Sequence, residues 1–209
     1  MKSMKNPWEK LDLEIYESHM KLANVSQLQL LNKIMKSQFY SYEVDSVGIW
    51  GIAGGNGLEH ISCNSFNLVY GIDINEEYLK ITKKRYPKLN CLFLKKLDLN
   101  EIAIDLNKVD LIIANLLLEY IGLDTFIIQI NQSLPKYLSC VIQKDNEGDF
   151  VSTSPYANSL RNISELALAI GEGELISKMD KNGFEIIFRE EYSLYNKKNF
   201  IRLDFKNNI

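Results

Sequence analysis

The chain has 209 residues, a formal net charge of −3 and 46% hydrophobic residues. This length and composition favour one domain with a sizeable core, and the slightly acidic balance argues against a dedicated nucleic-acid binder. No apolar run reaches the roughly 20 residues that span a bilayer, and the start MKSMKNPWEK lacks the apolar stretch of a signal peptide. We therefore expect a cytoplasmic protein with neither a membrane nor a nucleic acid as partner.

The three cysteines, Cys63, Cys91 and Cys140, are widely separated in the sequence. They form no CxxC pair and no cysteine–histidine ligand pattern, so neither a disulfide framework nor a zinc site is predicted. We expect reduced, partly buried thiols and no metal site.

The first forty residues predict helices. Residues 11–22 form a short amphipathic segment, and Leu28, Leu31 and Met35 recur on one face of a second segment. We expect residues 1–44 to form a helical extension and residues 45–209 to form the main domain.

From Ser46 onward, apolar strands alternate with helices. The expected strands read SVGIW, NLVYGID, CLFLKKLD, VDLIIAN and YLSCVIQ. The expected helices start at Leu58, after Asn75, at Leu123 and near Glu174. Two final strands, FEIIFREEYSLY and NFIRLDF, are joined by a short polar turn and must be antiparallel. The pattern predicts a doubly wound, Rossmann-like α/β fold, with a seven-stranded, mostly parallel sheet ending in an antiparallel hairpin.

Polar or small residues follow each of the first four strands. Gly51-Ile52-Ala53-Gly54-Gly55 follows the first strand, Asp73 the second, Asp98 the third and Asn115 the fourth. Ligands bind open α/β sheets at the carboxyl ends of the strands, so these residues predict one binding site. Each feature alone also has a structural interpretation: a tight turn at the glycines, a helix entry at Asp73 and a helix cap at Asp98.

Taken together, these motifs resemble those of the class I S-adenosylmethionine-dependent methyltransferases, whose glycine motif typically reads Gly-Cys-Gly-Thr-Gly. The resemblance covers roughly residues 46–205. It implies S-adenosylmethionine as cofactor, with Asp73 at the ribose and Asp98 at the adenine amino group. The cofactor-binding residues that it implies are Gly51, Ile52, Ala53, Gly55, Asp73, Ile74, Asp98, Leu99, Asn115 and Leu116.

Three positions depart from the family pattern. Ile49 stands where the family usually has an Asp or Glu. The polar contact that this acid would make with the cofactor is therefore missing or comes from another residue. Ala53 replaces a glycine, and leucines follow Asn115 where enzymes acting on adenine or glutamine amides have Pro-Pro-Tyr. A dinucleotide-binding GxGxxG motif is absent, because Ala53 and Asn56 stand where it needs glycines.

The helical extension offers candidates for the acceptor side. Tyr16, His19 and Met20 lie at helical spacing on one face. His19 is a candidate general base, Tyr16 could face the sulfonium cation, and Tyr120 could line the acceptor site. The alternative interpretation of this face is ordinary packing against the sheet.

These observations favour a methyltransferase that acts on a small-molecule acceptor. Two alternatives stay open, namely an enzyme that methylates a protein or RNA component, and a non-catalytic module that binds S-adenosylmethionine. The sequence does not indicate an oligomeric state.

Overall fold

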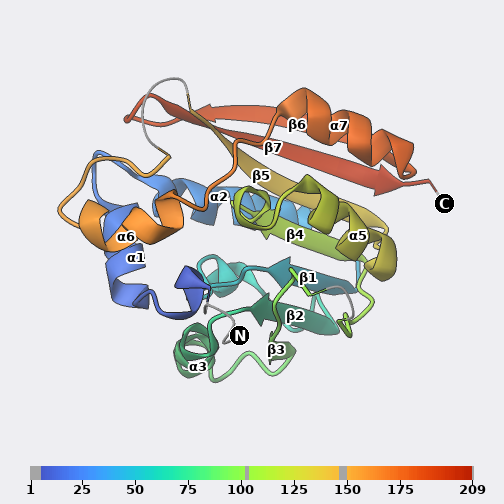
Figure 1. Cartoon of the computed structure of the whole chain (residues 1–209). Coiled ribbons are helices and arrows are strands. Elements are labelled where there is room, and N and C mark those ends of the chain that lie inside the picture. The colour runs from blue at the N-terminus through green and yellow to red at the C-terminus, as the bar shows by residue number, and fades with distance from the viewer. Residues whose placement is uncertain (1–5, 102–103, 146–149, 209) are drawn as a thin grey trace, which may run out of the picture.

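The computed structural model describes residues 6–101, 104–145 and 150–208, and a seven-stranded sheet organises them (Figure 1). The strand order is β3-β2-β1-β4-β5-β7-β6, with β1 to β5 parallel and β6 and β7 antiparallel. The strands are β1 (Ser46–Trp50), β2 (Leu68–Asp73), β3 (Leu92–Lys96), β4 (Leu111–Asn115), β5 (Tyr137–Asp145), β6 (Phe184–Ser193) and β7 (Lys198–Asn207). The predicted doubly wound sheet with a terminal hairpin is confirmed.

Helices cover both faces of the sheet (Figure 1). The helices are α1 (Leu13–Lys21), α2 (Gln27–Tyr40), α3 (Glu76–Arg85), α4 (Leu118–Ile121), α5 (Leu123–Ser133), α6 (Ala157–Ser164) and α7 (Glu172–Lys181). On one face, α2 and α3 bury Phe39 and Leu79 against the sheet. On the other face, α5 and α7 bury Phe126 and Met179. Because β1 and β4 are covered on both sides, they are almost entirely buried and apolar.

Two helices lie beyond the carboxyl ends of the parallel strands (Figure 1). These are α1, from the predicted extension, and α6, which the sequence did not predict. Leu11, just before α1, packs with Leu160 and Ile163 of α6. The chain order reverses between β1 and β4, so the two helices face the place where such sheets bind ligands. Within the described part of the chain, no helix has the length and apolarity to cross a membrane.

The turn after β1 does not lead into an α-helix, so that prediction is wrong. Leu58–His60 form a single 3₁₀ turn, and an irregular segment then leads to β2. The polar residues 62–65 lack the apolar periodicity that would continue a helix. In addition, α2 packs onto this turn: a Cβ built at Gly57 would lie 2.9 Å from the Cβ of Met35.

Cys63 and Cys91 form a disulfide, which corrects the expectation that all three thiols are reduced. Their Cα atoms are 5.5 Å apart, although the residues are separated by 28 positions in the sequence. The parallel pairing of β2 with β3 brings the segment before β2 close to the start of β3. Such a contact arises from the tertiary fold, so the spacing of the cysteines could not reveal it. Cys140 is a free, buried thiol.

We predict that Cys63→Ser lowers the free energy of unfolding by about 3–4 kcal/mol under oxidising conditions, because the disulfide closes a loop of moderate length. Urea unfolding measures the difference. Dithiothreitol should destabilise the parent protein by a similar amount and leave Cys63→Ser unchanged. Equal stability of the parent with and without the reductant would contradict the disulfide.

Candidate active site

A cavity lies at the carboxyl ends of β1, β2, β3 and β4 and opens to solvent. It brings together the four polar or small positions predicted to meet there, namely Gly51, Asp73, Asp98 and Asn115. The other predicted cofactor residues that line it are Ala53, Ile74, Leu99 and Leu116. The expected convergence of the strand ends is therefore present in the fold.

Ile52 and Gly55, which we also predicted to bind the cofactor, do not line this cavity. The side chain of Ile52 is buried in the apolar cluster on the side of the sheet covered by α2. Gly55 faces α3, where a built Cβ would lie 2.9 Å from Thr82 Cγ2. Its left-handed φ of +78° shapes the turn, so its role there is conformational.

Gly51, unlike Ile52 and Gly55, lines the cavity. Its φ is +70°, and a built Cβ would lie 3.3 Å from Leu117 Cδ1, which also lines the cavity. Glycine therefore keeps this part of the wall open and allows the turn.

Asp73 is buried at the end of β2 and holds the glycine turn by its carboxyl group. Its Oδ2 accepts the backbone N–H of Ala53 at 2.9 Å, and its Oδ1 accepts that of Asn75 at 2.8 Å. Burial raises the pKa of Asp73 to about 6, although the backbone N–H groups act in the opposite direction. The carboxyl is therefore mostly ionised at neutral pH and is able to accept hydrogen bonds from a ligand.

Tyr78 is a residue that the sequence analysis missed. It lies in the first turn of α3, is almost completely buried and lines the cavity. Its hydroxyl has no hydrogen-bond partner among the described residues, and neither does the buried Nε1 of Trp8, which also lines the cavity. Buried polar atoms are normally hydrogen-bonded, so the two atoms point to a polar ligand. A nucleoside with ribose hydroxyls and a purine fits this set of groups together with Asp73.

Asp98 lies at the rim of the cavity. Its Oδ1 accepts the backbone N–H of Asn100 at 2.9 Å and the side-chain amide of Asn100 at 3.1 Å. The carboxylate thus closes a turn after β3 while remaining beside the cavity, and the described residues 99–101 do not form the helix that the capping interpretation expected. Leu99 is buried next to it.

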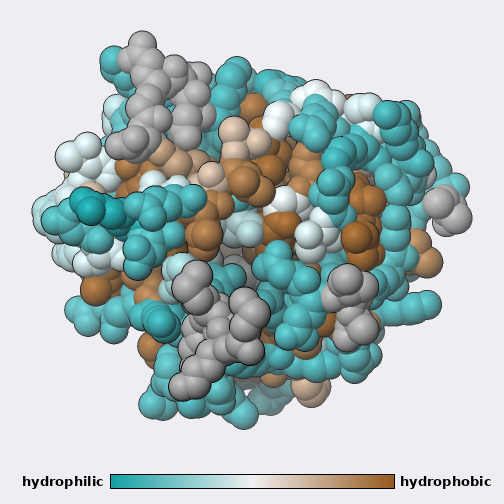
Figure 2. All heavy atoms as spheres, viewed as in Figure 1, coloured by the Kyte–Doolittle hydropathy of each residue, from teal (hydrophilic) through white to brown (hydrophobic). Residues whose placement is uncertain are grey.

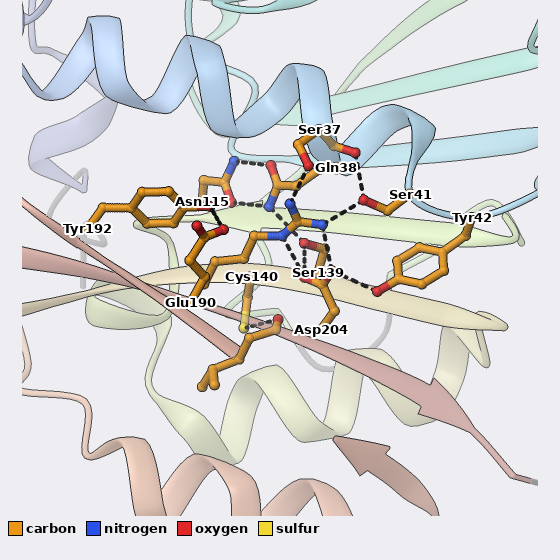
Figure 3. A network of polar contacts seen from close by, with 12 residues as sticks. Ser37, Gln38, Ser41, Tyr42, Asn115, Ser139, Cys140, Glu190, Tyr192 and Asp204 are labelled. Carbon is orange, nitrogen blue, oxygen red and sulfur yellow. Dashed lines mark hydrogen bonds and ion pairs between the residues drawn. The ribbon is translucent and has the colours of Figure 1, made fainter. Parts of the chain in front are cut away.

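Asn115 is held by a buried polar network that Figure 3 shows. Its amide exchanges two hydrogen bonds with Gln38 of α2, at 2.8 and 2.9 Å. Gln38 also donates to Ser139 Oγ at 2.8 Å, and Ser139 donates to the carboxylate of Asp204. Asp204 is paired with Arg202, and both are fully buried on β7. The network fixes the orientation of the Asn115 amide at the cavity wall.

A second cavity lies next to the first. Four residues line both cavities and form a shared wall: Trp8, Tyr16, Leu116 and Tyr120. The ring of Trp8 packs edge-on against Tyr16 and Tyr120, with centroids 5.4 and 4.8 Å away. Tyr16 and Tyr120, two of the three predicted catalytic residues, therefore lie between the two cavities.

The third predicted catalytic residue, His19, lines only the second cavity. It is buried, and its Nδ1 lies 2.8 Å from Ser154 Oγ, in the segment after β5. Burial lowers the pKa of His19, and the nearby cation of Lys198 lowers it further. The imidazole is therefore neutral at pH 7, as a general base must be.

The outer part of the second cavity is formed by α6 and the segment before it. Phe150, Val151, Leu160 and Ile163 contribute apolar side chains. In the space-filling view, hydrophobic residues gather in the middle of this face, between α6 and the α5–α7 pair (Figure 2). Among the described residues that line the second cavity, none is an Asp, Glu, Lys or Arg.

Residues 50–136 match the family model described as a methyltransferase domain. No curated protein sequence matches the chain significantly. The N-methyltransferase NodS from Bradyrhizobium japonicum WM9, in complex with S-adenosyl-L-homocysteine, is 14% identical with a TM-score of 0.68, over 98% of this chain and 100% of that one.

The magnesium protoporphyrin IX methyltransferase from Synechocystis PCC 6803, with bound S-adenosylmethionine, is 14% identical with a TM-score of 0.64, over 100% of both chains. A geranyl diphosphate methyltransferase in complex with S-adenosylmethionine is 10% identical with a TM-score of 0.63, over 87% of this chain and 89% of that one. At these identities the likeness shows a shared fold.

The buried carboxyl of Asp73 predicts a pH-dependent site. Because ionised Asp73 is the better hydrogen-bond acceptor, S-adenosylmethionine affinity should be full above pH 6 and fall as the pH drops through about 6. Asp73→Asn should weaken binding at pH 7.5 by on the order of 1–3 kcal/mol and remove the pH step. Calorimetry between pH 5 and 8 tests both, with thermal melting to verify the fold. A pH step that persists in Asp73→Asn would assign the titration to another group.

Two glycines of the same turn provide a contrasting pair. Gly51→Val should weaken cofactor binding by at least tenfold, because its side chain would enter the cavity wall beside Leu117, and it should also lower the melting temperature, because valine disfavours the φ of +70°. Gly55→Val should mainly lower the melting temperature, because its side chain would clash with Leu58 and Thr82 behind the turn. Binding and melting of both variants are compared. If the folded Gly51→Val protein keeps parental affinity, the cofactor does not pass this turn.

Proposed function

We propose that the chain is a class I S-adenosylmethionine-dependent methyltransferase and that it methylates a small-molecule acceptor bound in the second cavity. The observation that carries this proposal is the pair of adjacent cavities with a common wall. One cavity has the acidic and polar groups suited to a nucleoside, and the other, between α1 and α6, is lined mostly by apolar and aromatic side chains with no Asp, Glu, Lys or Arg among the described residues.

The position of the second cavity supports a small acceptor. The cavity lies inside the protein between α1, α6 and the shared wall, a position that a folded protein or RNA does not reach. Two of the structural neighbours are named for small acceptors, a magnesium porphyrin and geranyl diphosphate. We infer that nucleic acid is not a partner and that residues 1–44 act as a lid over the main domain, residues 45–209, through α1, because α2 packs against a face of the sheet. Residues 1–5 lie outside the described part. A cytoplasmic location also remains our proposal.

The bound cofactor would supply an activated methyl group on a sulfonium. The protein residues then hold the nucleoside and place the acceptor. Of these two tasks, Asp73, Tyr78 and Asn115 serve the first, and the shared wall of Trp8 and Tyr120 serves the second. Alignment of this kind contributes several kcal/mol to rate acceleration without any charged catalytic group.

His19 is suited to receive a proton when the acceptor is a hydroxyl or an N–H group. If its Nδ1–H donates to Ser154 Oγ, then Nε2 carries a lone pair and acts as the base. Ser154 Oγ also accepts the backbone N–H of Tyr156 at 3.1 Å, which holds the serine in place. His19 is thus the proposed base, and Ser154 sets its tautomer.

The second cavity can be blocked without changing the first. Val151 lines only the second cavity and is partly exposed, so a larger side chain is tolerated by the fold. We predict that Val151→Trp retains S-adenosylmethionine affinity within threefold and loses at least 90% of turnover in an acceptor screen that detects S-adenosyl-L-homocysteine release. Val151→Ala is the matched control and should remain active. Full turnover by Val151→Trp would place the acceptor elsewhere, and cofactor binding without turnover on any acceptor would favour a non-catalytic module.

His19 has its own test in the same assay. His19→Asn should lower kcat by about 10²–10⁴-fold, as expected for loss of a general base, and abolish the acidic limb of the pH profile. Cofactor affinity should not change, because His19 does not line the first cavity. A parental kcat and pH profile would show that the acceptor loses no proton to His19.

A further inference from the structure

Glu17 is a buried carboxylate on α1 that pairs with Arg85 and, at 3.8 Å, with Lys21, and that also faces a cavity. Only 7% of the Glu17 residue is exposed, although α1 lies at the edge of the molecule (Figure 1). Glu17 lines a third cavity, on the other side of the glycine turn. That cavity shares Tyr16, Gly51, Ala53 and Asn115 with the first one, so the two form adjoining parts of one site.

Arg85, the last residue of α3, clamps Glu17 onto the glycine turn. Its Nη2 donates to Glu17 Oε2 at 2.8 Å, and its Nη1 donates both to Glu17 Oε1 at 2.5 Å and to the carbonyl of Gly54 at 3.0 Å. A Cβ built at Gly54 would lie 2.5 Å from Arg85 Nη1 and closer still to Glu17 Oε1. Gly54 is therefore required for α1 and α3 to meet on this turn.

The charged residues that line the two adjoining cavities are divided between them. Asp73 and Asp98 line the first cavity, whereas Glu17 is the only charged residue among the described ones that line the third. Ile49, at the end of β1, lines the third cavity with an apolar side chain. S-Adenosylmethionine carries an α-ammonium at the end opposite its adenine. With the nucleoside at Asp73, the carboxylate next to the amino-acid end is that of Glu17.

We propose that Glu17 receives the α-ammonium of S-adenosylmethionine, an assignment that rests on the proposed function of the same site. The carboxylate missing at Ile49 thus comes from the covering helix α1. Arg85 orients Glu17 and keeps its charge paired before the ligand arrives. Recognition of the amino-acid end and closure of α1 over the glycine turn are then a single event.

A ligand without the amino-acid end separates this role from a structural one. 5′-Methylthioadenosine has the nucleoside and a thioether but lacks the ammonium and the carboxylate. In calorimetry, Glu17→Gln should weaken S-adenosylmethionine binding by at least tenfold and change 5′-methylthioadenosine binding by less than twofold. Glu14→Gln, on the exposed side of α1, is the matched control and should bind both ligands like the parent. Thermal melting verifies that each variant is folded.

Arg85→Met separates the clamp from the contact with the ligand. This variant retains the Glu17 carboxylate, so it should lose less S-adenosylmethionine affinity than Glu17→Gln. Equal losses for the two ligands in Glu17→Gln, or no loss for either, would overturn the assignment and leave Glu17 as a packing residue. A parent protein that binds neither ligand would contradict the proposed function and this assignment together. Cofactor binding without methyl transfer would contradict only the proposed function.

Discussion

The site depends on one buried carboxyl group, that of Asp73. It accepts the N–H of Ala53 in the glycine turn and that of Asn75, which caps α3. The side-chain amide of Asn75 in turn donates to the backbone carbonyls of Trp8 and Leu11. A single residue at the end of β2 therefore ties together the glycine turn, the start of α3 and, through Asn75, the segment that leads into α1. A charge buried at this depth is tolerated because it is hydrogen-bonded, and it remains available to a ligand at the cavity.

The covering helix is attached by polar contacts as well as by packing. Asn75 binds the segment before α1. Within α1, Glu17 is paired with Arg85 of α3, and His19 is hydrogen-bonded to Ser154 in the segment after β5. Each contact joins α1 or the segment before it to a segment that lines a cavity, so a movement of α1 would change both cavities together. Apolar packing alone is non-directional, whereas these hydrogen bonds fix how the helix is rotated over the site.

The sequence was sufficient to predict the sheet and the strand-end residues, because both follow from local patterns. Apolar runs mark β1 and β4, and the Asn75 cap with the flanking charges marks α3. It was insufficient wherever a contact links distant segments. The Cys63–Cys91 disulfide depends on the pairing of β2 with β3, and the missing helix after Gly57 depends on the packing of α2. Tyr78 and Glu17 carry no motif of their own, so only the cavities reveal them.

The shared wall is built from neutral side chains, and this has a chemical reason. Among the described residues, those that line both cavities are Trp8, Tyr16, Leu116 and Tyr120, while the carboxylates of Asp73 and Glu17 stay outside the acceptor cavity. A ring face attracts a nearby cation by about 0.5–2 kcal/mol, which is enough to favour its position. A carboxylate at the same place would pair with a sulfonium more strongly in the bound cofactor than at the transition state, where that charge is being lost. Stabilisation of the ground state in this way would slow transfer. A neutral wall between the carboxylates of Asp73 and Glu17 would therefore suit the proposed cofactor, because it would hold the two ends without reducing the reactivity of the methyl group.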